Sequence, residues 1–323
     1  MRPKCFITRV IPEAGMELIR KHLDADVWEG ELPPPRDVFF ERVRGVQGIL
    51  CLLSDRIDKE VMDAAGDSLK VISVMAVGYD NVDVQEATRR GILVTNTPGA
   101  LTETTADLTF ALILAIARRV VEAVQFVKQG KWKTWSPTLL LGEDVYGKTI
   151  GIIGFGRIGQ AVARRAKGFA MEVLYYDYKG REFDGGKRCK TLDELLSHAD
   201  FVTLHIPSTP ENKKIVDKRF FEKMKPTAFF INVARGDLVD TGALVDALRQ
   251  KRIKGAALDC TDPEPLPPDH PLLSLDNCIV LPHIGSASEK TRNEIARLAA
   301  INLIKALASE MPPHPVNPEV LGR

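Results

Sequence analysis

A glycine-rich segment directly after an apolar strand offers the strongest indication of chemistry in this chain. Residues 149–153 read as a strand, and a G-x-G-x-x-G pattern follows, just before a helical pattern begins. Such glycines allow a tight turn, close approach of a pyrophosphate and close packing of the helix on the strand. The helix start then offers unpaired N–H groups to the phosphates. The predicted dinucleotide-binding residues are Gly154, Phe155, Gly156, Arg157, Ile158 and Gly159.

An acidic residue at the end of the next apolar strand indicates which nicotinamide cofactor this site would bind. Asp177 follows a strand over 173–176, at about the 20-residue spacing where an acid bonds the ribose 2′-hydroxyl. A carboxylate at this place repels a 2′-phosphate, so the sequence favours NAD(H) and makes NADP(H) the less favoured cofactor. Lys179 and Arg181 lie nearby in the sequence and leave room for some use of NADPH.

Three polar residues that could hold an anion and move a proton follow later strands of the same unit. They are Arg235, Glu264 and His283, and each comes just after an apolar stretch that reads as a strand. Ligands of such sheets bind beyond the carboxyl ends of the strands. We therefore expect the three side chains to converge near the cofactor.

These side chains fit the reduction of a 2-oxo acid by hydride transfer. The carbonyl oxygen needs a proton, and His283 is the natural donor because an unperturbed histidine has a pKa of ~6.5. Glu264, bonded to the other ring nitrogen, would fix the tautomer and stabilise the imidazolium. Arg235, a permanently charged planar guanidinium, can hold the substrate carboxylate and polarise the carbonyl. His205 ends a strand and is expected to line the cofactor site without chemistry, and the other histidines are expected to be structural or on the surface.

The composition is that of an ordinary globular protein and excludes several other functions. The 323 residues include 44 basic and 43 acidic ones, so a net charge of +1 gives no argument for nucleic acid or an anionic membrane. Five scattered cysteines without C-x-x-C spacing indicate a reducing cytoplasm, no disulfide framework and no zinc site, and no other metal is expected. The longest apolar run is far shorter than the ~20 residues of a membrane span, and the N-terminus does not read as a signal peptide.

Short apolar strands alternate with helical patterns along the whole chain, which predicts α/β layers with parallel sheets. In the first part we expect strands at Cys5–Thr8, Ile49–Leu53, Val71–Met75 and Ile92–Thr95. In the second part we expect strands at 149–153, 172–176, 200–205, 228–232, 254–258 and 278–281. Six strands behind a dinucleotide fingerprint match a doubly wound sheet. A last helix, from about Ser288 to Ala308, could pack back on the first part.

Taken together, these motifs resemble the D-isomer-specific 2-hydroxyacid dehydrogenase family over nearly the whole chain. The matching segments are 154–159, 232–236, 262–266 and 281–286. The resemblance implies a flavodoxin-like substrate-binding domain of residues 1–100 and 288–323, with a Rossmann dinucleotide-binding domain of residues 101–287 inserted in it. It also implies that the Arg, Glu and His named above are the catalytic set, and that the chain forms homodimers through its cofactor domains.

Within this family the chain most resembles the glyoxylate/hydroxypyruvate reductases, through residues 51–55, 97–107 and two tryptophans, Trp132 and Trp135. This resemblance implies substrate contacts from Leu53, Val77, Gly78 and, in the neighbouring subunit's site, Trp135. It implies further cofactor contacts from Thr104, His205, Pro207, Val233, Ala234, Asp259 and Gly285. From the residues alone, the turn at Val77 and Gly78 is either an anion-binding nest or an ordinary turn.

The expected activity is NADH-dependent reduction of glyoxylate and hydroxypyruvate to glycolate and D-glycerate, and three alternatives stay open. D-3-phosphoglycerate dehydrogenase would need extra cations, and residues 52–54 offer none; no regulatory domain is expected after the last helix. D-lactate dehydrogenase differs only in pocket shape, which residue identities do not reveal. An NAD-sensing corepressor-like module could dispense with the acid, but all three catalytic residue types are present here.

Overall fold

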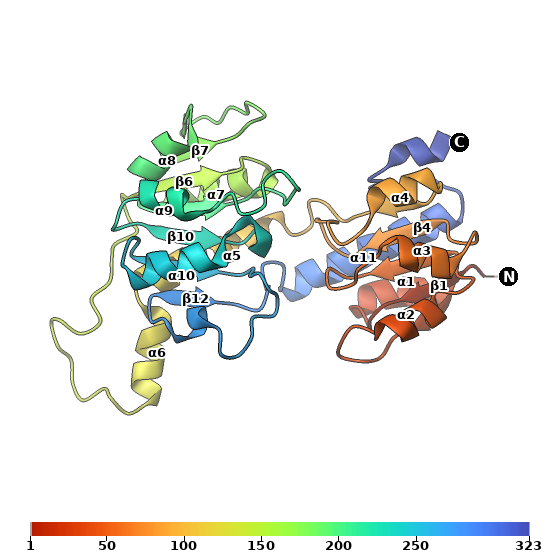
Figure 1. Ribbon diagram of the computed structural model, residues 1–323, viewed down its shortest axis with the longest axis horizontal. Helices are drawn as coiled ribbons and strands as arrows, with labels where there is room; N and C mark the ends of the chain where they lie inside the picture. Colours follow the sequence, from red (N-terminus) through yellow and green to blue (C-terminus); the bar gives the residue numbers. More distant parts are fainter. Residues whose placement is uncertain (1, 323) are drawn as a thin grey trace. The chain divides into compact units, whose positions relative to one another are not determined.

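A computed structural model describes residues 2–322, which divide into two compact units (Figure 1). Unit 1 is built from the chain up to Leu101 and from Ala287 onward, and unit 2 is Thr102–Ser286. Each unit contains one parallel sheet with helices against it. Within the described residues, no helix is long and apolar enough to cross a membrane.

The sheet of unit 1 has five parallel strands in the order β2-β1-β3-β4-β5. The strands are β1 (Lys4–Ile7), β2 (Asp24–Val27), β3 (Gly48–Cys51), β4 (Val71–Val74) and β5 (Leu93–Thr95). Its helices are α1 (Glu13–His22), α2 (Arg36–Arg42), α3 (Lys59–Ala65), α4 (Val84–Arg89) and α11 (Glu289–Leu307). This strand order is that of flavodoxin-like sheets, in which ligands bind where the order reverses, here between β1 and β3.

Both faces of this sheet are buried, because successive residues of each strand point to opposite sides. Phe6 and Ile49 belong to the core on one face, and Ile7 and Leu50 belong to the core on the other. α11 covers the second face together with α1. The hydroxyl group of Ser73 in β4 donates a hydrogen bond of 2.9 Å to the backbone carbonyl oxygen of Ala299 in α11. The last long helix of the chain is therefore part of unit 1.

The sheet of unit 2 has seven parallel strands in the order β12-β11-β10-β9-β6-β7-β8. The strands are β6 (Thr149–Ile153), β7 (Glu172–Tyr176), β8 (Lys187–Arg188), β9 (Phe201–Leu204), β10 (Phe229–Asn232), β11 (Gly255–Leu258) and β12 (Cys278–Val280). Counted from β6, this is the Rossmann order with one further strand, and the order reverses between β6 and β9. A dinucleotide is expected beyond the carboxyl ends of these two strands.

Unit 2 has helices on both faces of its sheet and a further helix, α6, without buried residues. These helices are α5 (Thr102–Ala117), α6 (Val120–Lys128), α7 (Arg157–Gly168), α8 (Leu192–His198), α9 (Lys218–Lys223) and α10 (Thr241–Arg249). Phe229 and Ile231 of β10 face the core formed with α5 and α7, whereas Phe230 faces the core formed with α8, α9 and α10. The strands are thus held between two layers of packed helices, which fixes the positions of the strand ends.

The predicted fold class is confirmed, and the apolar strands lie within one or two residues of the expected positions. Three elements were not predicted. β2 and β8 are short edge strands with polar sequences and largely unburied side chains, so they carry no apolar signal. α2 begins directly after three consecutive prolines, at Arg36, and has only one buried residue.

Candidate active site

The turn between β6 and α7 has the space and the backbone conformation that a pyrophosphate requires. Gly154 has φ of 90°, a conformation that L side chains rarely adopt, and a Cβ there would lie 2.5 Å from the carbonyl oxygen of His205. A Cβ at Gly159 would lie 2.2 Å from the carbonyl oxygen of Gly154. A Cβ at Gly156 would meet no heavy atom within 4 Å, and no side chain caps the helix that follows. The turn therefore fits a phosphate cradle at a helix N-terminus.

Asp177 directly follows β7, and its side chain is 2% exposed. Its Oδ1 accepts hydrogen bonds from the backbone N–H of Phe155, at 3.3 Å, and from Nη1 of Arg181, at 3.0 Å. The backbone N–H of Arg181 also donates to Oδ2, at 3.3 Å. The Asp177 carboxylate is thus fixed by a hydrogen bond to the turn between β6 and α7, and it also pairs with the guanidinium of Arg181.

Glu264 and His283 come together beyond the carboxyl ends of β11 and β12. Nδ1 of His283 lies 2.7 Å from Oε1 of Glu264, and the backbone N–H of Thr261 donates to Oε2 at 3.2 Å. Burial raises the pKa of Glu264, but the bond to His283, the Thr261 N–H and the charge of Arg235 together bring it below the usual value. A carboxylate that stays ionised beside the ring stabilises an imidazolium.

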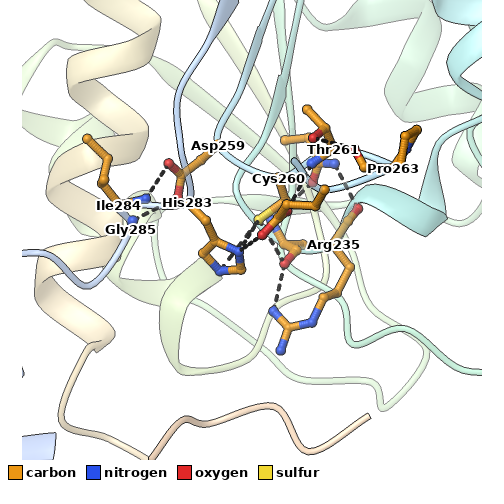
Figure 2. A network of polar contacts seen from close by, with 11 residues as sticks. Arg235, Asp259, Cys260, Thr261, Pro263, His283, Ile284 and Gly285 are labelled. Atoms are coloured by element: carbon orange, nitrogen blue, oxygen red, sulfur yellow. Dashed lines mark hydrogen bonds and ion pairs between the residues drawn. The ribbon is translucent and has the colours of Figure 1, made fainter. Parts of the chain in front are cut away.

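Arg235 follows β10 and lies in the same polar network, shown in Figure 2. Its Nη1 donates to the carbonyl oxygen of Ala234 at 2.9 Å, and its own carbonyl oxygen accepts from the side-chain amide of Asn232 at 2.8 Å. Asn232 also accepts from the N–H of Ala234 at 3.0 Å, so its fully buried side chain fixes the backbone on both sides of residue 234. The charged end of Arg235 is thus held just beyond β10, at the same edge of the sheet as His283, which follows β12.

The backbone of His283 adopts a left-handed conformation that Asp259 holds in place. His283 has φ of 54°, which costs a non-glycine residue of the order of 1–3 kcal/mol. Its N–H donates to the carbonyl oxygen of Asp259 at 3.0 Å, and the N–H groups of Ile284 and Gly285 each donate to a carboxylate oxygen of Asp259 at 2.7 Å (Figure 2). Burial raises the pKa of Asp259, while these two donors oppose that rise. The residue patterns held no signal for this anchoring contact.

The remaining residues expected near the cofactor lie around the same strand ends. His205 follows β9, and burial lowers its pKa to about 3, which favours the neutral ring. Its Nε2 lies 3.0 Å from Oγ1 of Thr203. Thr105 of α5 donates to the carbonyl oxygen of Gly285 at 3.1 Å, which links this helix to the turn after β12. Pro207 follows β9, Val233 and Ala234 follow β10, and Thr104 precedes Thr105 in α5.

The residues expected to contact substrate in unit 1 follow β3 and β4. Leu53 is 38% exposed, and the carbonyl oxygen of Val77 accepts from the side-chain amide of Asn96 at 2.7 Å, beside Gly78. The described residues also contain a nearby cation that sequence reasoning missed. Arg9, two residues after β1, donates to Oγ of Ser54 at 3.1 Å and lies 3.6 Å from Oδ1 of a buried acid, Asp55.

Arg9 follows β1, at the place where the strand order of unit 1 reverses. This position is the only feature from which a role in ligand binding could have been predicted, because the contacts of Arg9 join residues far apart in the sequence. The buried carboxyl of Asp55 has a raised pKa through burial, opposed by Thr8, the N–H of Leu52 and Arg9. The guanidinium charge therefore has an acidic partner, and the loop after β3 is tied to β1.

Comparisons with known proteins place these residues in a family context. Residues 110–285 match the family model described as D-isomer specific 2-hydroxyacid dehydrogenase, NAD binding domain. The chain is 51% identical over 325 residues to a glyoxylate reductase of Korarchaeum cryptofilum, covering 99% of this chain and 98% of the relative.

Solved structures are similar over the same extent. The TT0316 protein of Thermus thermophilus is 47% identical, with a TM-score of 0.92, covering 97% of this chain and 99% of that one. An NADPH-dependent glyoxylate/hydroxypyruvate reductase of Sinorhizobium meliloti, solved with NADP and malonate, is 34% identical, with a TM-score of 0.85, covering 98% of this chain and 97% of that one.

Proposed function

The chain belongs to the D-isomer-specific 2-hydroxyacid dehydrogenase family and is therefore an oxidoreductase with an NAD-binding Rossmann domain, and we propose that it reduces glyoxylate and hydroxypyruvate with NADH. The products would be glycolate and D-glycerate. The observation that carries this proposal is the 2.7 Å contact between His283 and Glu264, in one network with Arg235. The full-length likeness to proteins named glyoxylate reductase supports the choice of a small 2-oxo acid.

Each residue of this network has a separate role in the proposed reaction. Arg235 binds the substrate carboxylate and draws electron density from the carbonyl group. His283 gives the proton from its Nε2 to the carbonyl oxygen, because Nδ1 is engaged by Glu264. Glu264 keeps the ring oriented and stabilises its protonated form. NADH, when bound, supplies the hydride that the carbonyl carbon accepts.

The same proposal assigns the binding of cofactor and substrate to the two units. In unit 2 the turn from Gly154 to Gly159 would hold the pyrophosphate, and Asp177 would bond the ribose hydroxyl group. The residues proposed to line the rest of the cofactor site are Thr104, His205, Pro207, Val233, Ala234, Asp259 and Gly285. In unit 1, Leu53 and the backbone N–H groups of Val77 and Gly78 would contact the substrate.

We propose NADH as the preferred cofactor, with Arg181 as the reason that NADPH is not excluded. Asp177 is fixed where a 2′-phosphate would meet its negative charge. Arg181 pairs with that carboxylate at 3.0 Å and could turn toward a phosphate instead. The similar reductase from S. meliloti is named NADPH-dependent and was solved with NADP, so the likeness alone does not fix the cofactor.

A homodimer is the proposed assembly, with α6 as a contact surface. Four valines of α6, Val120, Val121, Val124 and Val127, are each between 46% and 52% exposed. Figure 1 shows α6 and the segment after it, in yellow, extending away from the sheet of unit 2. Trp135 in that segment is 77% exposed, and we propose that a second copy of the chain receives it in its substrate site. Exposed apolar faces of this kind mark protein interfaces.

The alternatives left open by the sequence receive less support. Arg9 brings a cation to Ser54, as a phosphorylated substrate would need, but Asp55 already balances its charge. A pyruvate-specific enzyme would use the same catalytic residues and differ only in the shape of the pocket. A module that only senses NAD would have no use for the Glu264–His283 contact.

Substitution of His283 by alanine tests the proposed roles directly. We expect His283→Ala to lower turnover on glyoxylate by roughly 100- to 10,000-fold, the usual range for a lost general acid. Binding of NADH, measured by fluorescence titration, should stay nearly unchanged, because the ring is assigned to proton transfer. Unaltered turnover would remove His283 from the mechanism. A loss of NADH binding would indicate that the variant has lost its cofactor site as well.

A further inference from the structure

Cys260 brings a thiol to the Glu264–His283 pair. Its Sγ lies 3.8 Å from both Nδ1 and Nε2 of His283. Figure 2 marks these contacts with dashed lines. One ligand atom from each of Cys260, Glu264 and His283 lies within 4.8 Å of the other two. Thiolate, imidazole and carboxylate are the three ligand types that Zn²⁺ takes in proteins.

We propose that Cys260, Glu264 and His283 form an inhibitory Zn²⁺ site, in which the metal ion takes the place of the proton on Nδ1 of His283. The ion is a reversible inhibitor in this proposal and has no part in turnover. Binding of the ion depends only on the three ligands, whereas the inhibition rests on the function proposed above.

Two of the three distances between ligand atoms fit such a site after a small movement. Tetrahedral Zn²⁺, with bonds of about 2.3 Å to sulfur and about 2.0 Å to nitrogen, sets these two atoms about 3.5 Å apart. The 3.8 Å from Sγ of Cys260 to Nδ1 of His283 is close to that value. The 2.7 Å between Nδ1 and Oε1 of Glu264 is a hydrogen-bond distance, so this pair must separate by a fraction of an ångström. The ring must also rotate until the lone pair of Nδ1 faces the ion.

A metal ion from solvent would reach the site past Glu264 and His283. Cys260 is 2% exposed, but the side chains of Glu264 and His283 are 42% and 25% exposed. Water or a substrate oxygen would complete four-coordination, because the protein supplies three ligands. A soft thiolate favours Zn²⁺ over Mg²⁺ and Ca²⁺, which prefer oxygen ligands.

Binding of the ion and protonation of the ring exclude one another. Coordination releases the proton of the Cys260 thiol and the proton on Nδ1 of His283 to solvent. The ring then keeps a proton only on Nε2, and transferring it would leave a metal-bound imidazolate instead of a neutral imidazole. The enzyme thereby loses its proton donor. Because protons compete with the metal ion, inhibition should strengthen as the pH rises.

Titration of the full-length protein with Co²⁺, after removal of metals with a chelator, tests binding without any need for turnover. Co²⁺ takes the same ligands and gives a thiolate-to-metal absorption band when a cysteine binds it. We expect the band in the wild type and in Cys278→Ser, a matched cysteine at the start of β12, and no band in Cys260→Ser. Circular dichroism spectra of the two variants should match. A wild type without the band, or Cys260→Ser with it, would overturn the site.

The effect on activity is measured with the same three proteins. Zn²⁺ should inhibit glyoxylate reduction by the wild type and Cys278→Ser, and a chelator should restore it, whereas Mg²⁺ should have no effect. Cys260→Ser should keep most of its metal-free turnover and need at least about 10-fold more Zn²⁺ for half-inhibition. Equal inhibition of all three proteins would overturn the inhibitory role. A Co²⁺ band in a protein with no turnover on any 2-oxo acid would instead refute the proposed function and leave the metal site standing.

Discussion

Nδ1 of His283 and Oε1 of Glu264 lie 2.7 Å apart, although the two residues follow different strands of the unit 2 sheet. This contact orients the ring and leaves Nε2 as the nitrogen not bonded to the carboxylate. The pKa of Glu264 lies below its usual value, because the bond to His283 and neighbouring charges outweigh the effect of burial. The carboxylate therefore stays ionised throughout the pH range in which a histidine titrates.

Removal of the Glu264 charge should change how activity depends on pH. In the reduction direction the ring must donate a proton, so the protonated ring is the active form and activity declines toward alkaline pH. Glu264→Gln keeps the shape of the side chain but no longer stabilises the imidazolium. We expect kcat for glyoxylate reduction to fall by roughly 100-fold and the alkaline decline of kcat/KM to move to lower pH.

Asp269→Asn is the matched control for this variant, since it removes an exposed acid from the same proline-rich loop. Its pH profile should coincide with that of the wild type. An alkaline decline at the same pH in Glu264→Gln as in the wild type would show that the carboxylate does not stabilise the charged ring.

Replacement of Asp177 should weaken the preference for NADH over NADPH. A hydrogen bond to a charged group is worth ~1.5–3 kcal/mol, so Asp177→Ala should reduce the ratio of kcat/KM for NADH to that for NADPH by at least about 10-fold. The same change leaves Arg181 without its acidic partner and available to a 2′-phosphate. Asp184→Ala, an exposed acid in the same connection between β7 and β8, should keep the wild-type ratio. An unchanged ratio in Asp177→Ala would mean that the acid does not face the ribose.

His205 should contribute to loss of stability in acid. Its pKa is about 3 in the folded chain, against an ordinary value of 6.5, so the unfolded chain binds more protons between these two pH values. Stability then falls as the pH is lowered from about 6.5 toward about 3, and no contribution is expected above pH ~6.5. His205→Gln should therefore lose less Tm between neutral and acidic pH than the wild type. His198→Gln, at an exposed histidine, should behave like the wild type, and equal losses in all three would contradict the effect.

Local patterns accounted for the parts of the site that depend on neighbours in sequence. The glycines at 154, 156 and 159 act through one turn, and Asp177 ends the next strand, so spacing alone placed them. The expectation that Glu264 and His283 meet followed from a general rule about strand ends. Their catalytic roles remain predictions that the experiments above address.

Contacts between distant segments could not be predicted in this way. Cys260 reads in the sequence as a buried apolar residue, and its approach to His283 depends on how β11 and β12 pair. Arg9 meets Ser54 only because β1 and β3 are neighbours in the sheet. The hydrogen bonds from the backbone of Ile284 and Gly285 to the Asp259 carboxylate likewise join the loop after β12 to the loop after β11. Each contact requires the strand order, which periodicity does not reveal.

The central claim is tested most directly by the rates of NADH and NADPH oxidation with four 2-oxo acids, glyoxylate, hydroxypyruvate, pyruvate and 3-phosphohydroxypyruvate. We predict the highest kcat/KM for glyoxylate and hydroxypyruvate, with NADH preferred over NADPH. A clear preference for 3-phosphohydroxypyruvate or for pyruvate would contradict the proposed substrate class. No turnover of any of the four acids by a protein that still binds NADH would contradict the proposed reaction itself.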